Sequence, residues 1–345
     1  MPIEIDGGRV PKLLALKNRP LFERPTGKQI DYIRIALINN MPDAALEDTE
    51  IQFYELLDAA AGDIPISLKF FSLPELPRSE AGQRHLNNFY SDISELLNGR
   101  FDGVIMTGTE PRQPNLRDEP YWPVLTKVLD WAETHTASTV LSCLAAHAGV
   151  LYSDGIPRHR LDDKQFGVFH YEKVRDHALT AGGESAMRIP HSRWNEVRAD
   201  ALESCGYQVL VQSAQAGVDL FVKKKRDSLF VHFQGHPEYG TRTLLKEYRR
   251  DIKRFLRRER ETYPSMPQGY FDAAATKLLS DFGDKVTANP REELLGEFPE
   301  TTVVNGLQET WQLSATSVYR KWLQYLVSRK AEASSLSSMT SAVRG

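Results

Sequence analysis

Short apolar runs alternate with amphipathic stretches along the first half of this chain. Runs of strand length occupy residues 32–39, 66–71, 102–108 and 138–142. Stretches with helical periodicity follow them at residues 47–57, 122–131 and 144–151. Strands that alternate with helices at this spacing are typical of a parallel sheet with helices on both faces. The pattern therefore predicts an α/β fold with a doubly wound, mostly parallel sheet.

The second half of the chain is less regular. Three consecutive strands, partly antiparallel, are predicted at residues 207–211, 218–222 and 228–233. A charged helix is expected at 243–258, a loop-rich segment from about 260 to 300, and an aromatic helix at 318–327. We therefore predict four parts, namely an irregular lead-in (1–30), a main domain (31–258), a C-terminal extension with the aromatic helix (259–330) and a disordered tail (331–345).

Composition narrows the class of protein. The 345 residues are 41% hydrophobic and 26% charged, with a net charge of −3, which gives no case for binding nucleic acid or an anionic membrane. The segment Met1–Asp6 lacks the basic flank and apolar run of a signal peptide, and no stretch approaches the roughly 20 apolar residues of a membrane span. We therefore expect a cytoplasmic protein without nucleic-acid or membrane partners.

The chain has two cysteines, Cys143 and Cys205. In a reducing cytoplasm both are expected to be free thiols. Neither has a neighbour at metal-ligand spacing, so no metal site is predicted.

Cys143 stands where an apolar strand ends and a helix of small residues begins. A cysteine at this junction lies over the N-terminus of the helix, where unpaired amides and the helix dipole favour a thiolate. Further along, the apolar run 228–233 is followed by His236 and Glu238. A thiol, a base and a carboxylate that orients the base are the parts of a covalent acyl-transfer site.

Each part alone has a plainer interpretation. A cysteine at a strand end is usually a small buried hydrophobe, and a single His-x-Glu is usually surface chemistry. Both parts, however, follow strands of one predicted α/β sheet, and such sheets place their sites at the carboxyl edge. This conjunction makes Cys143, His236 and Glu238 a candidate triad.

Several motifs, in order along residues 32–255, resemble the homoserine O-acyltransferases that are related to class I glutamine amidotransferases. The motifs are Met41-Pro42 with Thr49-Glu50, His85-Leu86-Asn87-Asn88-Phe89-Tyr90, residues 101–108, Tyr121-Trp122-Pro123, the Cys143 turn, Gly155-Ile156-Pro157, Pro190-His191-Ser192-Arg193, Gly235-His236-Pro237-Glu238-Tyr239 and Glu247-Tyr248-Arg249-Arg250-Asp251. The resemblance implies a flavodoxin-like or amidotransferase-like fold with additional C-terminal helices.

The resemblance also implies an activity. Cys143 would take an acyl group from acyl-CoA in a ping-pong reaction of methionine biosynthesis, and His236, oriented by Glu238, would activate the hydroxyl of L-homoserine. The amides of Leu144 and Gly108 would form the oxyanion hole. Acyl-CoA would be a co-substrate with no bound cofactor, and the protein is expected to be a homodimer.

The resemblance further implies the substrate-binding residues. Arg250 would pair with the carboxylate of the acceptor, although an exposed helix arginine is the plainer alternative. Ser192 and Arg193 would help line the acceptor and acyl pocket. We expect structural roles for His147 and His170, while His191 is either structural or part of the site.

The chain departs from the family in three places. The loop after Met41-Pro42, residues 43–48, is longer than in the family and lacks its lysines. Leu144 stands where tryptophan is common. Arg112 stands where glycine accompanies succinyl-CoA and glutamate accompanies acetyl-CoA, and its guanidinium suits the carboxylate of a succinyl group, although it could instead fill the pocket or bind a phosphate of CoA.

These departures leave several functions open. Succinyl is slightly favoured over acetyl as the acyl group, and L-serine or another hydroxy amino acid is the alternative acceptor. A glutamine amidotransferase-type hydrolase is less favoured, because those enzymes usually flank the cysteine with glycines, where this chain has Ser142, Leu144 and Ala145. A non-catalytic sensor is the third alternative, and the presence of all three triad residues argues against it.

Overall fold

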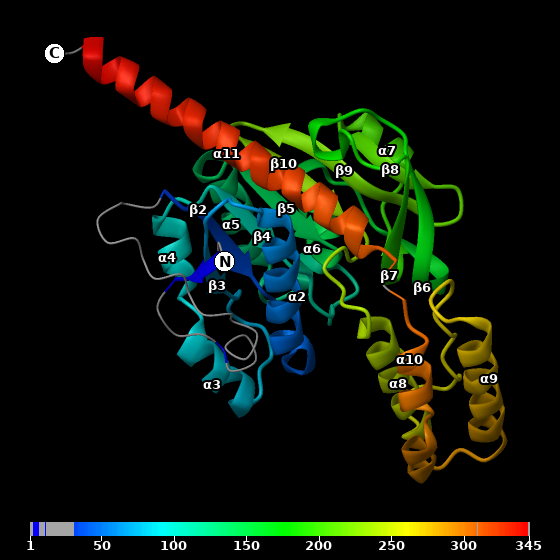
Figure 1. Cartoon of the computed structure of the whole chain (residues 1–345). Helices are drawn as coiled ribbons and strands as arrows, with labels where there is room; N and C mark the ends of the chain where they lie inside the picture. Colours follow the sequence, from blue (N-terminus) through cyan, green and yellow to red (C-terminus); the bar gives the residue numbers. More distant parts are fainter. Residues whose placement is uncertain (1–2, 7–10, 12–30, 309, 344–345) are drawn as a thin grey trace.

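The computed structural model describes residues 3–6, 11, 31–308 and 310–343 (Figure 1). Within these residues one ten-stranded sheet has the order β1-β3-β2-β4-β5-β10-β9-β8-β6-β7. Its parallel part consists of β1 (Ile3–Ile5), β3 (Ile66–Phe71), β2 (Ile33–Ile38), β4 (Gly103–Met106), β5 (Ser138–Ser142) and β10 (Ser228–Phe233). The mostly parallel α/β sheet is therefore confirmed.

The antiparallel part of the sheet continues from β10. It consists of β9 (Gly217–Lys225), β8 (Gln208–Ser213), β6 (His159–Lys173) and β7 (Ala186–Glu196). The predicted antiparallel pairing within residues 207–233 is confirmed, whereas the long hairpin of β6 and β7 was not predicted. Its polar residues hide the alternation, because part of β6 is exposed on both sides.

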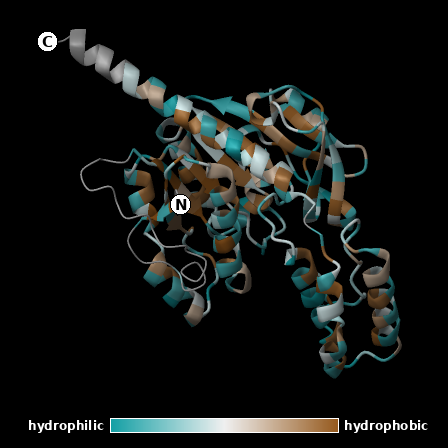
Figure 2. Ribbon diagram, viewed as in Figure 1, coloured by the Kyte–Doolittle hydropathy of each residue, from teal (hydrophilic) through white to brown (hydrophobic). Residues whose placement is uncertain are grey.

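Helices cover both faces of the parallel part. Along β2, Ile35 and Leu37 belong to one hydrophobic cluster, whereas Ala36 and Ile38 belong to another. The first cluster includes side chains of α2 (Asp43–Ala61) and α11 (Gln312–Val343), and the second includes α4 (Ile93–Asn98), α5 (Trp122–His135) and α6 (Leu144–Asp154). The hydrophobic residues gather on the central strands and on the helix faces that pack against them (Figure 2). The remaining helix of this part, α3 (Glu80–Phe89), lies between β3 and α4 in the chain.

A second group of helices extends from the antiparallel end of the sheet (Figure 1). It contains α8 (Thr243–Leu256), α9 (Ala273–Ala288) and α10 (Glu300–Asn305), which share a hydrophobic cluster with Phe166 and Val168 of β6. A short helix, α7 (Ala199–Ser204), packs near β8 in a cluster of its own. No helix among the described residues is long and apolar enough to span a membrane.

Three predictions about the ends of the chain need correction. The segment 260–300, predicted to be loop-rich, contains α9 and the start of α10, because apolar residues such as Leu279 and Val286 pack against α8. The predicted lead-in contains β1, while residues 1–2, 7–10 and 12–30 lie outside the described part. The predicted aromatic helix is confirmed, but α11 continues to Val343, where a disordered tail was expected from residue 331.

The docking of α11 on the sheet yields a prediction about stability. A Cβ atom on Gly103 of β4 would lie 2.7 Å from Leu326 Cδ1 and 2.8 Å from Trp322 Cζ2, both on α11. We expect Gly103→Ala to lower the free energy of unfolding by about 1–3 kcal/mol, because the added methyl overpacks a filled core. Urea unfolding monitored by tryptophan fluorescence measures this change.

The matched control is Gly296→Ala, since a Cβ atom there would meet nothing within 4 Å. Equal effects of the two substitutions on unfolding would contradict the close packing of α11 against β4.

Candidate active site

Cys143 occupies a strained turn between β5 and α6. It caps the N-terminus of α6 with φ +52° and ψ −113°, a backbone region that residues other than glycine rarely adopt. Its amide donates to the carbonyl of Phe233 at 2.8 Å, and its own carbonyl accepts from Ala146 at 3.0 Å. The turn therefore presents the sulfur above the first amides of a helix, where negative charge is stabilised.

The pairing of β5 with β10 brings the base to the nucleophile. These strands are parallel, with Ser142 opposite Phe233, so the residues that follow each strand emerge at the same edge. The side chain of Cys143 acts directly on the imidazole of His236 and shifts its pKa, so the two side chains lie close together. Its Nδ1 lies 2.9 Å from Oε1 of Glu238, which leaves Nε2 for the sulfur. The three predicted triad residues are therefore together.

Electrostatics favours an ion pair between the thiol and the imidazole. Burial of His236 disfavours its cation, but the charges of Cys143 and Glu238, together with the hydrogen bond that the imidazole donates to Glu238, outweigh burial. Together they raise the pKa of His236 well above its usual range. A protonated imidazole in contact with the sulfur stabilises the thiolate, which is the nucleophilic form of cysteine.

The turn that carries His236 is fixed by hydrogen bonds to surrounding strands. The side chain of Gln234 bonds to Val197 through both its oxygen and its nitrogen, to the carbonyl of Val218, and to His147 Nε2 at 2.9 Å. The amide of His236 donates to the carbonyl of Pro190 at 2.9 Å. His147 therefore has the expected structural role, and burial lowers its pKa to about 3, which keeps it neutral.

The two residues predicted to supply the oxyanion amides, Gly108 and Leu144, are neighbours. A Cβ atom on Gly108 would lie 2.8 Å from both the amide nitrogen and Cβ of Leu144. Gly108 follows β4, which pairs in parallel with β5, so the two residues leave neighbouring strands at one edge. The amide of Leu144 belongs to the first turn of α6, where amides have no partner within the helix. The arrangement can receive a negative oxygen next to the sulfur.

Glu247 on α8 connects the triad to the predicted acceptor side. Its Oε1 accepts from the hydroxyl of Tyr239 at 2.6 Å, and the ring of Tyr239 stacks on His236 with centroids 4.2 Å apart. Its Oε2 accepts from Ser192 at 2.5 Å and lies 3.4 Å from Nη2 of Arg250. Two of the predicted substrate residues, Ser192 and Arg250, therefore lie together next to the base.

Lys164 of β6 is a functional candidate that the sequence analysis missed. Its Nζ lies 3.1 Å from Asp251 and 3.6 Å from Glu247, and its side chain is largely buried over the ring of Phe166. Burial alone would raise the pKa of Glu247, but Lys164 and Arg250 outweigh burial and lower it. No local signal marks Lys164, because its partners are more than 80 positions away in the chain.

Arg193 does not join this group, which corrects the prediction that it lines the acceptor pocket. Successive residues of a strand point to opposite faces, so Arg193 leaves β7 on the side opposite Ser192. Its guanidinium donates to His191 Nδ1, to the carbonyl of Asn195 and to the carbonyl of Ala216. It is a buried structural cation. His170, by contrast, is exposed on β6.

Arg112 lies in the loop after Gly108, at a separate cavity. The amides of Arg112 and Gln113 both donate to Oε1 of Glu119, at 2.6 and 2.8 Å, which fixes the loop. The side chain of Arg112 is exposed and lines a cavity of about 340 Å³. The lining residues are Asn40, Pro42, Leu76, Pro77, Arg78, Thr109, Glu110, Pro111 and Arg112.

The loop without lysines begins α2 and is paired with cations from elsewhere in the chain. Arg78 donates to the carbonyl of Met41 at 2.5 Å and to Asp43 at 3.2 Å. Lys246 of α8 lies 2.6 Å from Asp48. Asp43 and Asp48 are therefore paired with cations, whereas Glu47 lies 4.0 Å from Nδ1 of His85. The cations near the triad come from β6 and α8.

Comparison with known proteins agrees with these observations. A family model described as homoserine O-succinyltransferase matches residues 12–333. The homoserine O-succinyltransferase of Rhodopseudomonas palustris is 45% identical over 296 residues, covering 86% of this chain and 89% of the relative. That of Bradyrhizobium japonicum is 44% identical over 295 residues, covering 85% and 90%.

Solved structures are similar at lower identity. A glutamine amidotransferase from Thermotoga maritima is 14% identical with a TM-score of 0.46, and the match covers 86% of this chain and 99% of that chain. The matches to the family model and to the relatives span most of the chain and include Cys143, His236 and Glu238. The chain therefore belongs to the homoserine O-succinyltransferase family, a family of acyltransferases.

Proposed function

We propose that this protein transfers a succinyl group from succinyl-CoA to the side-chain hydroxyl of L-homoserine, through a thioester on Cys143, as a step of methionine biosynthesis. The contact of the Cys143 sulfur with a charged imidazole, which Glu238 orients, carries the proposal. The names of the relatives support both the acyl group and the acceptor.

The first half of the reaction is acylation of the cysteine. The thiolate of Cys143 attacks the carbonyl carbon of the thioester, and the oxygen receives the electron pair next to the amides of Leu144 and Gly108. When the tetrahedral intermediate collapses, the bond to the sulfur of CoA breaks and the imidazolium of His236 gives its proton to that sulfur. One amide of an oxyanion hole typically lowers the barrier by about 3 kcal/mol.

The second half is transfer to the acceptor. The neutral imidazole of His236 removes the proton of the homoserine hydroxyl as its oxygen attacks the carbonyl of the acyl-cysteine. The bond between carbon and Cys143 sulfur then breaks, which restores the thiolate and the imidazolium. Glu238 stays ionised and stabilises the cation in both halves.

Two guanidinium groups would recognise the ends of the substrates. Arg250 is half-exposed beside Ser192 and Glu247, so its remaining N–H groups can meet the acceptor carboxylate. Arg112 forms no ion pair with any residue that the structure describes, and it lines the cavity that begins at Thr109, directly after the oxyanion glycine. Its position favours a donor that carries a terminal carboxylate, which succinyl has and acetyl lacks.

The direct test of the function is mass spectrometry of the protein after incubation with succinyl-CoA alone. We expect one succinyl group on Cys143, with release of one free CoA thiol, because the second half of the reaction needs an acceptor. Addition of L-homoserine should discharge the thioester. Cys143→Ala should stay unmodified, and the matched Cys205→Ser should react as the wild type does.

The same assay separates the alternatives. Faster discharge by L-serine than by L-homoserine would replace the proposed acceptor, and faster acylation by acetyl-CoA would replace the proposed donor. Release of ammonia from glutamine without any acylation by either acyl-CoA would reject acyl transfer altogether.

Substitution of Arg112 tests the choice of donor. We expect Arg112→Ala to lower kcat/KM for succinyl-CoA by about 10- to 100-fold, since a charge-assisted hydrogen bond contributes about 1.5–3 kcal/mol. The value for acetyl-CoA should change much less. The control is Arg117→Ala, a nearby exposed arginine, and an equal fall for both donors would show that Arg112 does not read the acyl carboxylate.

Substitution of Arg250 tests the acceptor side. We expect Arg250→Ala to raise KM for L-homoserine by about tenfold or more and to leave the rate of Cys143 acylation close to that of the wild type. Steady-state kinetics and single-turnover CoA release measure the two quantities. Arg249→Ala is the matched control, because its side chain is equally exposed but pairs with Glu300.

A further inference from the structure

Two buried ionisable residues lie directly behind the turn that carries His236, and neither takes part in the steps above. Asp219 of β9 and His191 of β7 both have an exposed fraction of 0%. Oδ1 of Asp219 accepts from the amide of Gly235 at 2.6 Å, and its backbone carbonyl accepts from the amide of Gln234 at 3.0 Å. One residue therefore fixes the two amides that precede the base.

His191 connects Asp219 to a buried cation. Nε of Arg193 donates to Nδ1 of His191 at 3.2 Å, so the ring proton of the neutral histidine is on Nε2, which lies 3.5 Å from Oδ1 of Asp219. Burial, with the nearby charges of Arg193 and His236, lowers the pKa of His191 well below its usual range. A chain of polar contacts thus runs from Arg193 through neutral His191 and Asp219 to Gly235.

The turn is in van der Waals contact with this chain. A Cβ atom on Gly235 would lie 2.8 Å from both Oδ1 of Asp219 and Cε1 of His191, and 2.7 Å from Ile189. The backbone of the catalytic turn therefore has no room to move toward β7 or β9. A change in the hydrogen bond from Gly235 to Asp219 is transmitted to the next residue, His236.

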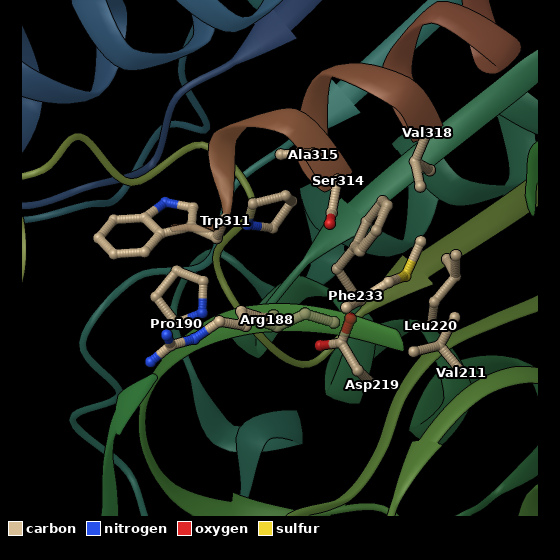
Figure 3. Close-up of a pocket in the computed structure, with 13 residues that line it drawn as sticks. Arg188, Pro190, Val211, Asp219, Leu220, Phe233, Trp311, Ser314, Ala315 and Val318 are labelled. Carbon is tan, nitrogen blue, oxygen red and sulfur yellow. The ribbon is translucent and has the colours of Figure 1, made fainter. Parts of the chain in front are cut away.

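The second carboxyl oxygen of Asp219 lies where burial of a polar atom is unfavourable. Oδ2 is buried and has no hydrogen-bond partner among the residues that the structure describes. Asp219 lines a cavity of about 20 Å³, with Phe233 and Leu220 close to its carboxyl group (Figure 3). The remaining lining residues are mostly apolar, namely Met187, Ile189, Pro190, Val211, Pro237, Trp311, Ala315 and Val318, with Arg188 and Ser314.

A carboxyl group in such surroundings is disfavoured as an anion. Burial raises the pKa of Asp219 to about 7, against the opposing effects of the Gly235 amide, Arg193 and His236, while Glu238 adds to the rise. An amide side chain would fit the same space without the cost of a buried charge. What the carboxyl group adds is a negative charge within electrostatic reach of the imidazolium of His236.

We propose that Asp219 is a positioning residue for the catalytic base. Its ionised carboxylate holds the turn at Gly235 and stabilises the imidazolium of His236, and protonation of Asp219 weakens the pair of Cys143 thiolate and His236 imidazolium. The charged and titratable groups that face Asp219 are Arg188, His191 and Arg193 from β7, Tyr171 from β6, and His236 and Glu238 from the turn after β10. The residues of α11 that line the cavity are uncharged.

Ionisation of Asp219 lowers the stability of the fold and raises the reactivity of Cys143. The pKa of Asp219 in the folded protein exceeds the value of about 3.9 for an unfolded chain, so its contribution to stability is complete at low pH and is lost as pH rises toward 7. Asp219→Asn removes the buried charge, and we expect its Tm to equal or exceed that of the wild type at pH 8. If Asp219 had only a structural role, Asp219→Asn would have a lower Tm than the wild type.

The test is the rate at which iodoacetamide alkylates Cys143 between pH 5 and 9, read by peptide mass spectrometry. We expect Asp219→Asn to react several-fold more slowly than the wild type at pH 8, because the weaker pair leaves less of Cys143 as the thiolate. The two rates should converge at pH 5, where Asp219 is protonated in the wild type as well. No acyl-CoA is needed, so this result is independent of the proposed function.

Two controls accompany the measurement. Cys205 reports ordinary thiol reactivity in the same samples. Asp154→Asn removes a carboxylate that binds Lys223 and Tyr207, so alkylation of Cys143 should be unchanged. If Asp219→Asn does not fold, the alkylation profile of the wild type must still show a step near pH 7 in addition to the thiol's own titration.

Two results would overturn the proposal. One is a profile for Asp219→Asn that coincides with the wild type at every pH. The other is a fall in Tm at pH 8 together with equal loss of reactivity across the whole pH range, which would make Asp219 a structural residue only.

Discussion

The parallel pairing of β5 with β10 is the constraint on which the whole site depends. Its register sets Ser142 opposite Phe233, and one hydrogen bond from the Cys143 amide to the Phe233 carbonyl closes the pair. On the other side of β5, β4 pairs in parallel as well, so Gly108, which follows β4, emerges at the same edge. Because successive strand residues face opposite sides, a shift of one residue in β10 would turn the base away from the sulfur. Three strand ends thus bring together Cys143, His236 and Gly108, the residues proposed as nucleophile, base and oxyanion donor.

The site maintains several unfavourable features at once. Cys143 has a positive φ, and Oε2 of Glu238 is buried without a hydrogen-bond partner among the described residues, as is Oδ2 of Asp219. Such features persist only where the surroundings determine the conformation. Here Gln234 bonds to α6, to β9 and to Val197 between β7 and α7, and Trp311, just before α11, donates to the carbonyl of Tyr239 at 2.8 Å. The C-terminal extension therefore contributes directly to the rigidity of the catalytic turn.

The sequence predicted the parts of this structure that are encoded locally. Short apolar runs located the parallel strands other than β1, and the break of a strand at Cys143 marked the candidate nucleophile, because both signals lie within ten residues. The hairpin of β6 and β7 escaped prediction because its first half is largely exposed and has no clear alternation. Helix α9 escaped because its buried residues share a cluster with residues of β6, α8 and α10, segments that are distant along the chain or that follow it. Likewise, Arg193 belongs to a recognisable motif, but only the pleat of β7 shows that it points away from Ser192.

The charge on the acceptor side of the site comes from several distant segments, so one loop of the sequence does not predict it. The family's lysines are missing after Pro42, and Asp43 and Asp48 there are paired with Arg78 and Lys246 from distant segments. The cations next to the base are Lys164 and Arg250, held by Glu247 and Asp251. Arg260 also belongs to this group, with Nη1 3.9 Å from Oδ2 of Asp251, so three cations face two carboxylates. An incoming carboxylate meets a small excess of positive charge, and it must compete with Glu247 and Asp251 for the N–H groups of Arg250.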